Sequence, residues 1–498
     1  MICDCCYKTE KKRGCFDMKS KLDKPFVHLF RTSEAFYMYD VNTDKIIGLP
    51  EEVYYELQKD KTSEGKTPVA KSYLSQLKEN GFLKMNRVEE VEHPVTKLLP
   101  YYLNHKINQL ILQVTQRCNL RCSYCVYSGA YQNRIHTQKR MDKGIAIRAI
   151  DYLFAHSKDN DMVYVSFYGG EPLLEMVLIK DCIGYINENY FGKKVNYNLT
   201  TNGTLIDEEN LSFFVENEIG LTFSLDGPAQ IHDFHRKFAD NNRGSFDVLI
   251  SNVKKIKELY PDYYKSHVSF NTVLDTENSF GCINDFILDD SVFQDNMFSA
   301  SVISDNYTDE ETKVSDVFIN EKEYEYFKLL LAKIGRIPQK YSSKILNSQF
   351  DEMFRKCFGD KRITMSELPR KYHHGGPCIP GTQRLFINAE GKFFPCEKVS
   401  EASHIACIGD IDNGIYPEKA ETVLNIERFT HDLCENCWAY KNCQICIAGC
   451  DDTNSISLKA TKKHCVDIKL SIENLFLDYC TLTEVGYSFE NERNNYNV

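Results

Sequence analysis

The chain divides into segments whose apolar residues follow different periods. Residues 25–100 begin with alternating apolar and polar positions, broken by a turn at Asn42-Thr43-Asp44, and continue with helical periodicity over 51–58 and 69–83. Strands followed by helices in so short a segment predict a winged-helix-like module. The polar stretch 89–93 predicts the boundary between this module and the next domain.

From Asn108 onward the alternation becomes strict, and helical segments separate the alternating stretches. Six apolar strands separated by helices predict parallel βαβ units that close into a full or partial barrel. The predicted fold class is therefore α/β, with a partial (β/α)6 TIM-like barrel over 108–305 and its chemistry at the carboxyl ends of the strands. The predicted strands cover 110–115, 163–168, 195–201, 221–226, 268–274 and 297–304.

Regular periodicity is weaker in the remaining segments. Residues 306–372 are polar and helical, which predicts a linker. Glycine and cysteine dominate residues 373–485, so this segment is predicted to be a domain held together by metal chemistry and without regular periodicity. Residues 1–24 form a polar tail, and no function is assigned to its four cysteines, Cys3, Cys5, Cys6 and Cys15.

Composition narrows the classes of function. The 498 residues are 42% hydrophobic and 26% charged, as in ordinary globular proteins, and no apolar run approaches the ~18 residues that span a bilayer. The first residues contain no hydrophobic stretch able to act as a secretory signal, so a cytoplasmic protein without a membrane segment is expected. The net charge of −11 disfavours nucleic acid as a partner. In a reducing compartment, 20 cysteines indicate metal or redox chemistry.

Three cysteines follow directly after the first predicted barrel strand. Cys118, Cys122 and Cys125 have the spacing C-x3-C-x2-C. Three thiolates on one short loop can hold three irons of a cubane iron–sulfur cluster and leave the fourth iron open, whereas structural zinc prefers four closed ligands. The spacing therefore predicts a cluster with one exchangeable coordination position.

Short polar segments close the following strands of the predicted barrel. Glycines there let the backbone approach a ligand closely, and carboxylates and hydroxyls suit an ammonium group and a ribose. With Tyr124 as the aromatic residue of C-x3-C-aromatic-C, these segments resemble the radical SAM superfamily over 108–305. The string SLDGPAQIHDFHR, followed by GSFD at 244–247, resembles the branch that modifies peptides and proteins. The residues concerned are Gly169, Gly170, Glu171, Thr200, Asn202, Ser224, Asp226 and Arg236.

The resemblance implies a four-iron–four-sulfur cluster on Cys118, Cys122 and Cys125, with S-adenosylmethionine on its open iron. Reductive cleavage of this cofactor would give a 5′-deoxyadenosyl radical, which takes a hydrogen atom from the substrate. By the same resemblance, Glu171 is expected to receive the cofactor's ammonium group and Arg236 to pair with its carboxylate. No residue is assigned as a catalytic acid or base.

A second cysteine array lies in the C-terminal segment. Cys378 and Cys396 flank a predicted hairpin with its turn at 388–391. A structural zinc array is one interpretation, because C-x2-C pairs also suit zinc. The other members of the array are Cys434, Cys437, Cys443, Cys446, Cys450 and Cys465.

The array resembles the SPASM domain of radical SAM maturases, which implies two auxiliary four-iron–four-sulfur clusters and three clusters in all. By this resemblance, Cys378 and Cys396 belong to the first auxiliary cluster. The spacing leaves either Cys446 or Cys450 for that cluster, with a slight preference for Cys446. The fourth ligand stays open among Cys357, Cys407 and Cys450, or that iron is free for a substrate thiolate. The second auxiliary cluster would be held by Cys434, Cys437, Cys443 and Cys465.

The N-terminal module resembles the winged-helix element that captures the leader of a ribosomally made precursor peptide. Such elements bind by strand addition, and the receiving edge is expected within 26–40. A generic packing domain is the alternative.

The favoured function is a peptide maturase that joins a cysteine sulfur to a carbon of a precursor peptide, with flavodoxin or ferredoxin as electron donor. Carbon–carbon crosslinking is an alternative within the same chemistry. A second enzymatic alternative is an anaerobic sulfatase-maturating enzyme, which oxidises a serine or cysteine to formylglycine; such enzymes usually begin close to their cluster motif. A zinc-ribbon scaffold is the non-enzymatic alternative.

Overall fold

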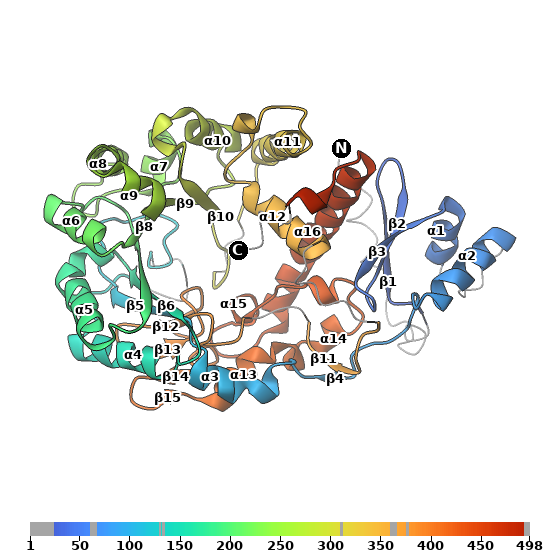
Figure 1. Ribbon diagram of the computed structural model, residues 1–498, viewed down its shortest axis with the longest axis horizontal. Helices are drawn as coiled ribbons and strands as arrows, with labels where there is room; N and C mark the ends of the chain where they lie inside the picture. Colours follow the sequence, from blue (N-terminus) through green and yellow to red (C-terminus); the bar gives the residue numbers. More distant parts are fainter. Residues whose placement is uncertain are drawn as a thin grey trace.

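The computed structural model describes residues 24–59, 67–128, 131, 135–308, 312–358, 366–374 and 378–492. The four cysteines of the N-terminal tail lie outside these residues. In the described parts of the chain, no helix is long and apolar enough to cross a membrane. A barrel, a C-terminal domain and a small N-terminal module follow one another along the long axis of the molecule (Figure 1).

Six parallel strands in sequential order form the barrel, which confirms the predicted α/β architecture. Apolar side chains at alternate positions of β6 are buried, as the period of the sequence requires. The strands are β5 (Gln109–Thr115), β6 (Met162–Gly169), β7 (Lys194–Thr201), β8 (Gly220–Ser224), β9 (Val268–Leu274) and β10 (Met297–Val302). The outer layer contains α4 (Lys143–Ala155), α5 (Met176–Asn189), α6 (Glu208–Glu216), α7 (Ala229–His235), α8 (Phe246–Leu259), α9 (Pro261–His267) and α10 (Phe280–Asp289) (Figure 1).

The sheet continues beyond the barrel into the C-terminal domain. Strand β12 (Leu385–Ile387) pairs in parallel with β5, and β13 (Lys392–Phe394), β14 (Gly409–Asp410) and β15 (Gly414–Ile415) extend the sheet in antiparallel fashion. The side chains of β12 are fully buried. This part of the C-terminal segment therefore shares one sheet and one core with the barrel.

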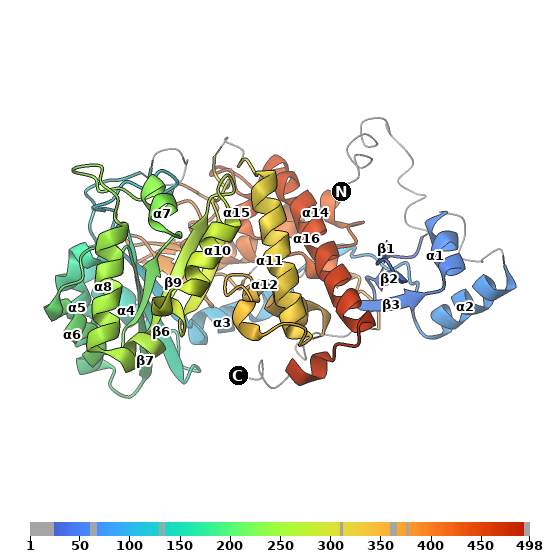
Figure 2. The ribbon, with the colours of Figure 1, turned by 90° about the horizontal axis from the view of Figure 1, so that it is seen from above.

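The predicted hairpin between Cys378 and Cys396 is present. Strands β12 and β13 form it, and Gly391 has a φ of +79° in the turn, a conformation that favours glycine. The helical segment after the barrel contains α11 (Asp316–Lys333) and α12 (Asn347–Cys357). Helix α11 packs on α10, and α12 packs on the long C-terminal helix α16 (Leu458–Glu484), so these helices join the barrel to the C-terminal domain (Figure 2).

The N-terminal module is an antiparallel sheet followed by two helices. Its strands are β1 (Val27–Arg31), β2 (Phe36–Asp40) and β3 (Lys45–Leu49), and its helices are α1 (Glu51–Gln58) and α2 (Pro68–Glu79). One face of the sheet, through Met38, packs on α1 and α2. The other face, through Phe30 and Tyr39, packs on Phe476 of α16 (Figure 1).

The range 26–40, in which the receiving edge is predicted, contains one edge of this sheet. Strand β2 is central, with β1 and β3 on its two sides, so within 26–40 only β1 is an edge, and the second edge, β3, lies outside that range. Strand β1 contacts α16, and His28 on it stacks on Trp438 at 3.7 Å between ring centroids.

The polar stretch 89–93 is not a free boundary between domains. Strand β4 (Glu90–Val91) pairs with β11 (Lys371–Tyr372) of the C-terminal region. The His93 N–H also donates to Asn425 Oδ1 at 2.7 Å. A chain cut before residue 95 would therefore lose a strand and expose the aromatic face on α16.

We expect Phe476→Ala to lower the free energy of unfolding by about 3–5 kcal/mol, because the ring is fully buried among aromatic neighbours on the docking face of the module. Urea unfolding followed by the fluorescence of Trp438, the single tryptophan, measures this at the interface itself. The control is Phe429→Ala, since Phe429 is 52% exposed. Equal stability of the two variants would contradict the packing described.

Candidate functional site

The backbones at the carboxyl ends of β5 and β6 approach each other closely. The Gly170 N–H donates to the carbonyl oxygen of Thr115 at 2.8 Å, and the Glu171 N–H donates to that of Arg117 at 2.8 Å. A Cβ on Gly169 or Gly170 would overlap the backbone of this loop, and Gly169 has a φ of +140°. The paired glycines thus let the end of β6 pack against the loop that carries Cys118, Cys122 and Cys125. From the sequence, these glycines were expected to make room for a ligand.

Cys118, Cys122 and Cys125 lie together on this loop and affect one another electrostatically. The Leu120 N–H donates to Cys118 Sγ at 3.3 Å, and the Tyr127 N–H donates to Cys125 Sγ at 3.4 Å. Burial raises the pKa of Cys118 to about 12 and that of Cys122 to about 11. These thiols are therefore neutral until a cation takes the place of their protons.

Glu171 is a fully buried brace between strand ends. Its Oε1 accepts from the Leu173 N–H at 3.0 Å and the Thr201 hydroxyl at 2.8 Å, and its Oε2 accepts from the Asn202 N–H at 2.8 Å. Burial raises the pKa of Glu171 to about 7 against these three hydrogen bonds. Three acceptor positions are thus filled by the protein itself, and the contact of Glu171 with a cofactor ammonium group stays a prediction.

Asp226 and Arg236 form a buried ion pair. The Arg236 Nε and Nη2 donate to the two carboxylate oxygens of Asp226 at 2.8 and 3.2 Å. Burial alone would raise the pKa of Asp226, but Arg236 holds it below its ordinary value. The carboxylate also accepts from the hydroxyl of Tyr124 in the cysteine loop and from the Val273 N–H of β9. In this structure the partner of Arg236 is therefore Asp226, and the contact of Arg236 with a cofactor carboxylate stays a prediction.

His235 of α7 also holds the cysteine loop, a role not expected from the sequence. Ser123 Oγ lies 2.6 Å from His235 Nδ1, and His235 Nε2 lies 3.0 Å from Asp275 Oδ2. The carboxylate favours a proton on Nε2, which leaves Nδ1 to accept from the serine. The string SLDGPAQIHDFHR contained this signal, because Ser123 and Tyr124, between Cys122 and Cys125, are both held by α7 or its flanks.

The other predicted cofactor residues lie at the ends of β7 and β8. Asn202 Nδ2 donates to Asn119 Oδ1 at 2.9 Å and lies 3.9 Å from Cys118 Sγ. A cavity of about 190 Å³ opens beside Cys118 and Asn119. Thr200 and Ser224 are half-buried at their strand ends.

The C-terminal cysteines form two groups. Cys446 raises the pKa of Cys396 and is itself affected by Cys378, so these three thiols lie near one another. The second group is linked in the same way, through Cys443, which is near Cys437 and Cys465, and Cys434, which is near Cys443 and Cys437. We call the first set, Cys378, Cys396 and Cys446, group I, and the second set, Cys434, Cys437, Cys443 and Cys465, group II.

Three further cysteines lie in the array region, and one of them, Cys450, is a neighbour of both groups. Cys450 is fully buried, and its cysteine neighbours are Cys446 and the group II thiols of Cys443 and Cys465. Cys357 lies beside Cys480, between α12 and α16. The Cys407 thiol donates to the Gly409 carbonyl at 3.6 Å.

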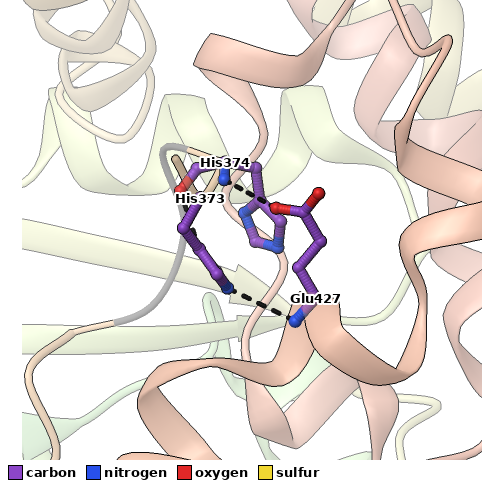
Figure 3. Close-up of side chains that lie close together, drawn as sticks. All are labelled: His373, His374 and Glu427. Carbon is purple, nitrogen blue, oxygen red and sulfur yellow. Dashed lines mark hydrogen bonds between the residues drawn. The ribbon is translucent and has the colours of Figure 1, made fainter. Parts of the chain in front are cut away.

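A compact set of metal-type ligands adjoins group II (Figure 3). Within the described residues, His373, His374 and Glu427 bring ligand-type atoms within 4.8 Å of one another. The Glu427 N–H donates to His373 Nε2 at 3.3 Å, and His373 Nδ1 lies 3.0 Å from the His374 carbonyl, so both ring nitrogens of His373 are used. The Glu427 carboxylate accepts from the His374 N–H and the Tyr440 hydroxyl. The three residues are thus held by hydrogen bonds near Cys434. Burial raises the pKa of the Cys434 thiol, and the charge of Glu427 raises it further.

A buried amide–carboxylate network joins the cysteine loop to the hairpin of group I. Glu401 accepts from Gln113 of β5 at 2.6 Å, from Gln116 at 3.3 Å and from Asn388 of the hairpin turn at 3.2 Å. Gln113 also accepts from the Ala389 N–H at 2.9 Å. These bonds, together with the β5–β12 pairing, fix group I relative to the loop of Cys118, Cys122 and Cys125.

Comparison with protein-family models assigns the barrel. The model of the radical SAM superfamily matches residues 112–282, from β5 into α10. The chain contains a radical SAM domain. The matched segment includes the cysteine loop, the paired glycines and the Asp226–Arg236 pair.

The chain is also similar to proteins of known sequence. It is 38% identical over 143 residues to an uncharacterized protein of Methanocaldococcus jannaschii, a match that covers 29% of this chain and 46% of that protein, less than half of its length. It is 26% identical over 354 residues to a cysteine-type anaerobic sulfatase-maturating enzyme of Clostridium novyi, covering 69% of this chain and 87% of that protein. Over this range the chain is homologous to anaerobic sulfatase-maturating enzymes.

A solved structure shares the fold. Native anSMEcpe with bound AdoMet superposes with a TM-score of 0.55 at 19% identity, over 74% of this chain and 98% of that chain. At this identity the likeness concerns the fold.

We expect Asp226→Asn to lower the free energy of unfolding by about 3–5 kcal/mol, because it leaves the Arg236 guanidinium buried without its counter-charge. The matched control is Asp247→Asn, the same chemical change at an exposed position of α8. Urea denaturation of both variants measures the difference. If both variants unfold at the same urea concentration as the parent protein, the ion pair does not stabilise the loop.

Proposed function

We propose that the protein is a radical SAM maturase that modifies a ribosomally made precursor peptide, and that it forms a bond between a cysteine sulfur and a carbon of that peptide. The observation that carries the proposal is the combination of a radical SAM domain with two further cysteine groups and a docked sheet whose outer strand β3 is open to a peptide.

We propose that Cys118, Cys122 and Cys125 hold a four-iron–four-sulfur cluster and that groups I and II hold two auxiliary ones. When bound to the open iron of the first cluster, S-adenosylmethionine supplies a 5′-deoxyadenosyl radical on one-electron reduction. The neighbourhood of Cys446 with Cys378 and Cys396 favours Cys446 over Cys450 as the third ligand of group I. Group I then has three protein thiols, and a substrate thiolate is a suitable fourth ligand.

Side chains at the strand ends would position S-adenosylmethionine. Asn202, whose amide nitrogen lies 3.9 Å from Cys118 Sγ, is a proposed contact of the methionyl part of the cofactor. Glu171 and the Asp226–Arg236 pair keep the strand ends fixed around it. Because these carboxylates are already hydrogen-bonded in the structure, binding would need little rearrangement of the site.

The N-terminal module is proposed to hold the leader of the precursor peptide along β3. The β2 side of β3 is paired, and no described strand pairs with its other side. Apart from the Gly48 carbonyl, which accepts from the Tyr73 hydroxyl, the outward-facing backbone groups of β3 would be satisfied by an added strand, which gives affinity with few side-chain requirements.

Formylglycine formation on a sulfatase is the second candidate. Its support is the similarity to cysteine-type anaerobic sulfatase-maturating enzymes over 69% of this chain. Both reactions remove one hydrogen atom and one further electron from the substrate, so the same three cysteine groups serve either. The mass of the product distinguishes them, since a thioether keeps the sulfur and formylglycine loses it.

We expect about twelve irons per chain after anaerobic reconstitution, from three clusters of four. The Cys118→Ala/Cys122→Ala/Cys125→Ala variant should lose about four of them and all formation of 5′-deoxyadenosine with dithionite, because the auxiliary groups lie elsewhere. Iron analysis and chromatography measure both quantities. Appreciable 5′-deoxyadenosine from this variant would exclude the assignment, and about four irons with bound zinc in the parent protein would make the C-terminal groups zinc sites.

We expect Gly48→Pro to weaken leader binding strongly while leaving cofactor cleavage unchanged. The Gly48 carbonyl accepts from the Tyr73 hydroxyl at 3.0 Å, which indicates that its backbone faces the open side of β3, so proline removes an N–H there. Fluorescence anisotropy of a labelled leader peptide measures the affinity, and circular dichroism checks the fold. The control Tyr73→Phe removes only the side-chain hydrogen bond. Unchanged leader affinity in the proline variant would leave the module as a packing domain.

A further inference from the structure

Helix α16 carries a basic face beside group II. Lys459, Lys462 and Lys463 are exposed along its first turns. Lys469 lies close enough to Cys465 and Cys437 to oppose the rise in pKa that burial gives both thiols. The whole chain has a net charge of −11, so this face is a local reversal of the surface charge.

Apolar side chains are exposed between these lysines. Leu458 is 45% exposed, Val466 61% and Leu470 56%. At about 100° per residue, these three and the four lysines fall within an arc of about 140° on the helix, with Cys465 at its margin. Helix α16 packs on α12, on α15 (Ile447–Cys450) and on β1. We call Leu458–Leu470 the α16 face.

Few acidic groups neutralise this face. Lys463 pairs with Asp305 at 2.9 Å, which ties α16 to the loop after β10. Asp467 is exposed at the margin, and Glu473, one turn further on, lies 3.5 Å from His28. In the described part of the chain, Lys459 and Lys462 have no ion pair. A face of lysines with scattered apolar contacts suits a weak, electrostatically steered encounter, of the class that buries less than about 1,200 Å².

We propose that the α16 face docks a small acidic one-electron carrier protein, with a flavin or iron–sulfur centre, for electron exchange with group II. The proposal rests on the proposed function, because it requires a cluster on group II. The charge of such a carrier is complementary to the face, and Cys465 places the ligand set at its edge. A precursor peptide fits less well, since the open strand β3 lies on the far side of β2 from β1, the strand that contacts α16.

The electron balance of the reaction requires an acceptor, which the carrier would provide. One electron enters per turnover and cleaves S-adenosylmethionine to methionine and the 5′-deoxyadenosyl radical, which takes a hydrogen atom from the substrate carbon. When that carbon radical bonds to the cysteine sulfur, the thiol proton goes to solvent and one electron leaves the substrate. The oxidised carrier on the α16 face takes up that electron and becomes its one-electron-reduced form.

The test is binding of oxidised flavodoxin to the reconstituted full-length protein, measured by biolayer interferometry at low and high salt. We expect Lys459→Glu/Lys462→Glu to weaken binding about tenfold at low salt and to flatten the salt dependence. The matched control is Lys254→Glu/Lys265→Glu, the same charge change on exposed positions of α8 and α9 at the barrel end, which should bind like the parent protein (Figure 1). Mixing dithionite-reduced, desalted protein with flavodoxin should give semiquinone absorbance more slowly in the α16 variant than in the control.

Three outcomes would overturn the docking proposal: no binding by the parent protein, equal affinities of the two double variants, or loss of precursor-peptide binding in the α16 variant, which would assign the face to the substrate. The proposed function fails separately, through absence of iron on group II or of modified peptide.

Discussion

The buried ion pair of Asp226 and Arg236 is the interaction on which the cysteine loop depends. Neither charge is stable in the interior alone, so the two groups must stay together and must be supplied with further hydrogen bonds. Asp226 meets this requirement by accepting from Tyr124 of the loop and from the backbone of β9. The pair thus joins the end of β8, the end of α7, β9 and the residue next to Cys125. Ser123, held by His235, adds a second tie to the same two-residue interval.

Direct pairing and hydrogen bonding also fix the C-terminal domain against the barrel. Strand β12 lies against β5, the strand that leads into the cysteine loop, and Glu401 is hydrogen-bonded by amides from both sides. Group I is therefore attached to the sheet that carries Cys118, Cys122 and Cys125, and the separation between these two cysteine groups is set by backbone pairing.

The N-terminal module is attached to the other end of the C-terminal domain. Its sheet packs on Phe476, and His28 stacks on Trp438, the residue after Cys437 of group II. Asn442 donates to the Tyr39 hydroxyl at 2.9 Å, next to Cys443. A peptide bound at β3 would therefore lie on a body that is continuous with the group II ligands, while the α16 face stays exposed to a redox partner.

The sequence by itself determined the local elements and the chemistry. Alternation with period two placed all six barrel strands, and the cysteine spacing after β5 pointed to a radical SAM domain, because both depend on residues that are neighbours in the chain. Only the tertiary structure decided which distant segments of the chain pair with one another. The sheet joining β5 to β12, the insertion of residues 89–93 beside β11 and the central place of β2 involve pairings between distant segments, and short strands leave too little periodic signal to predict them. The same holds for Arg236, Glu171 and the paired glycines. Their residue types suggested contact with a cofactor, but burial requires each polar group to find a partner, and in the folded chain those partners are Asp226, the strand ends and the loop backbone.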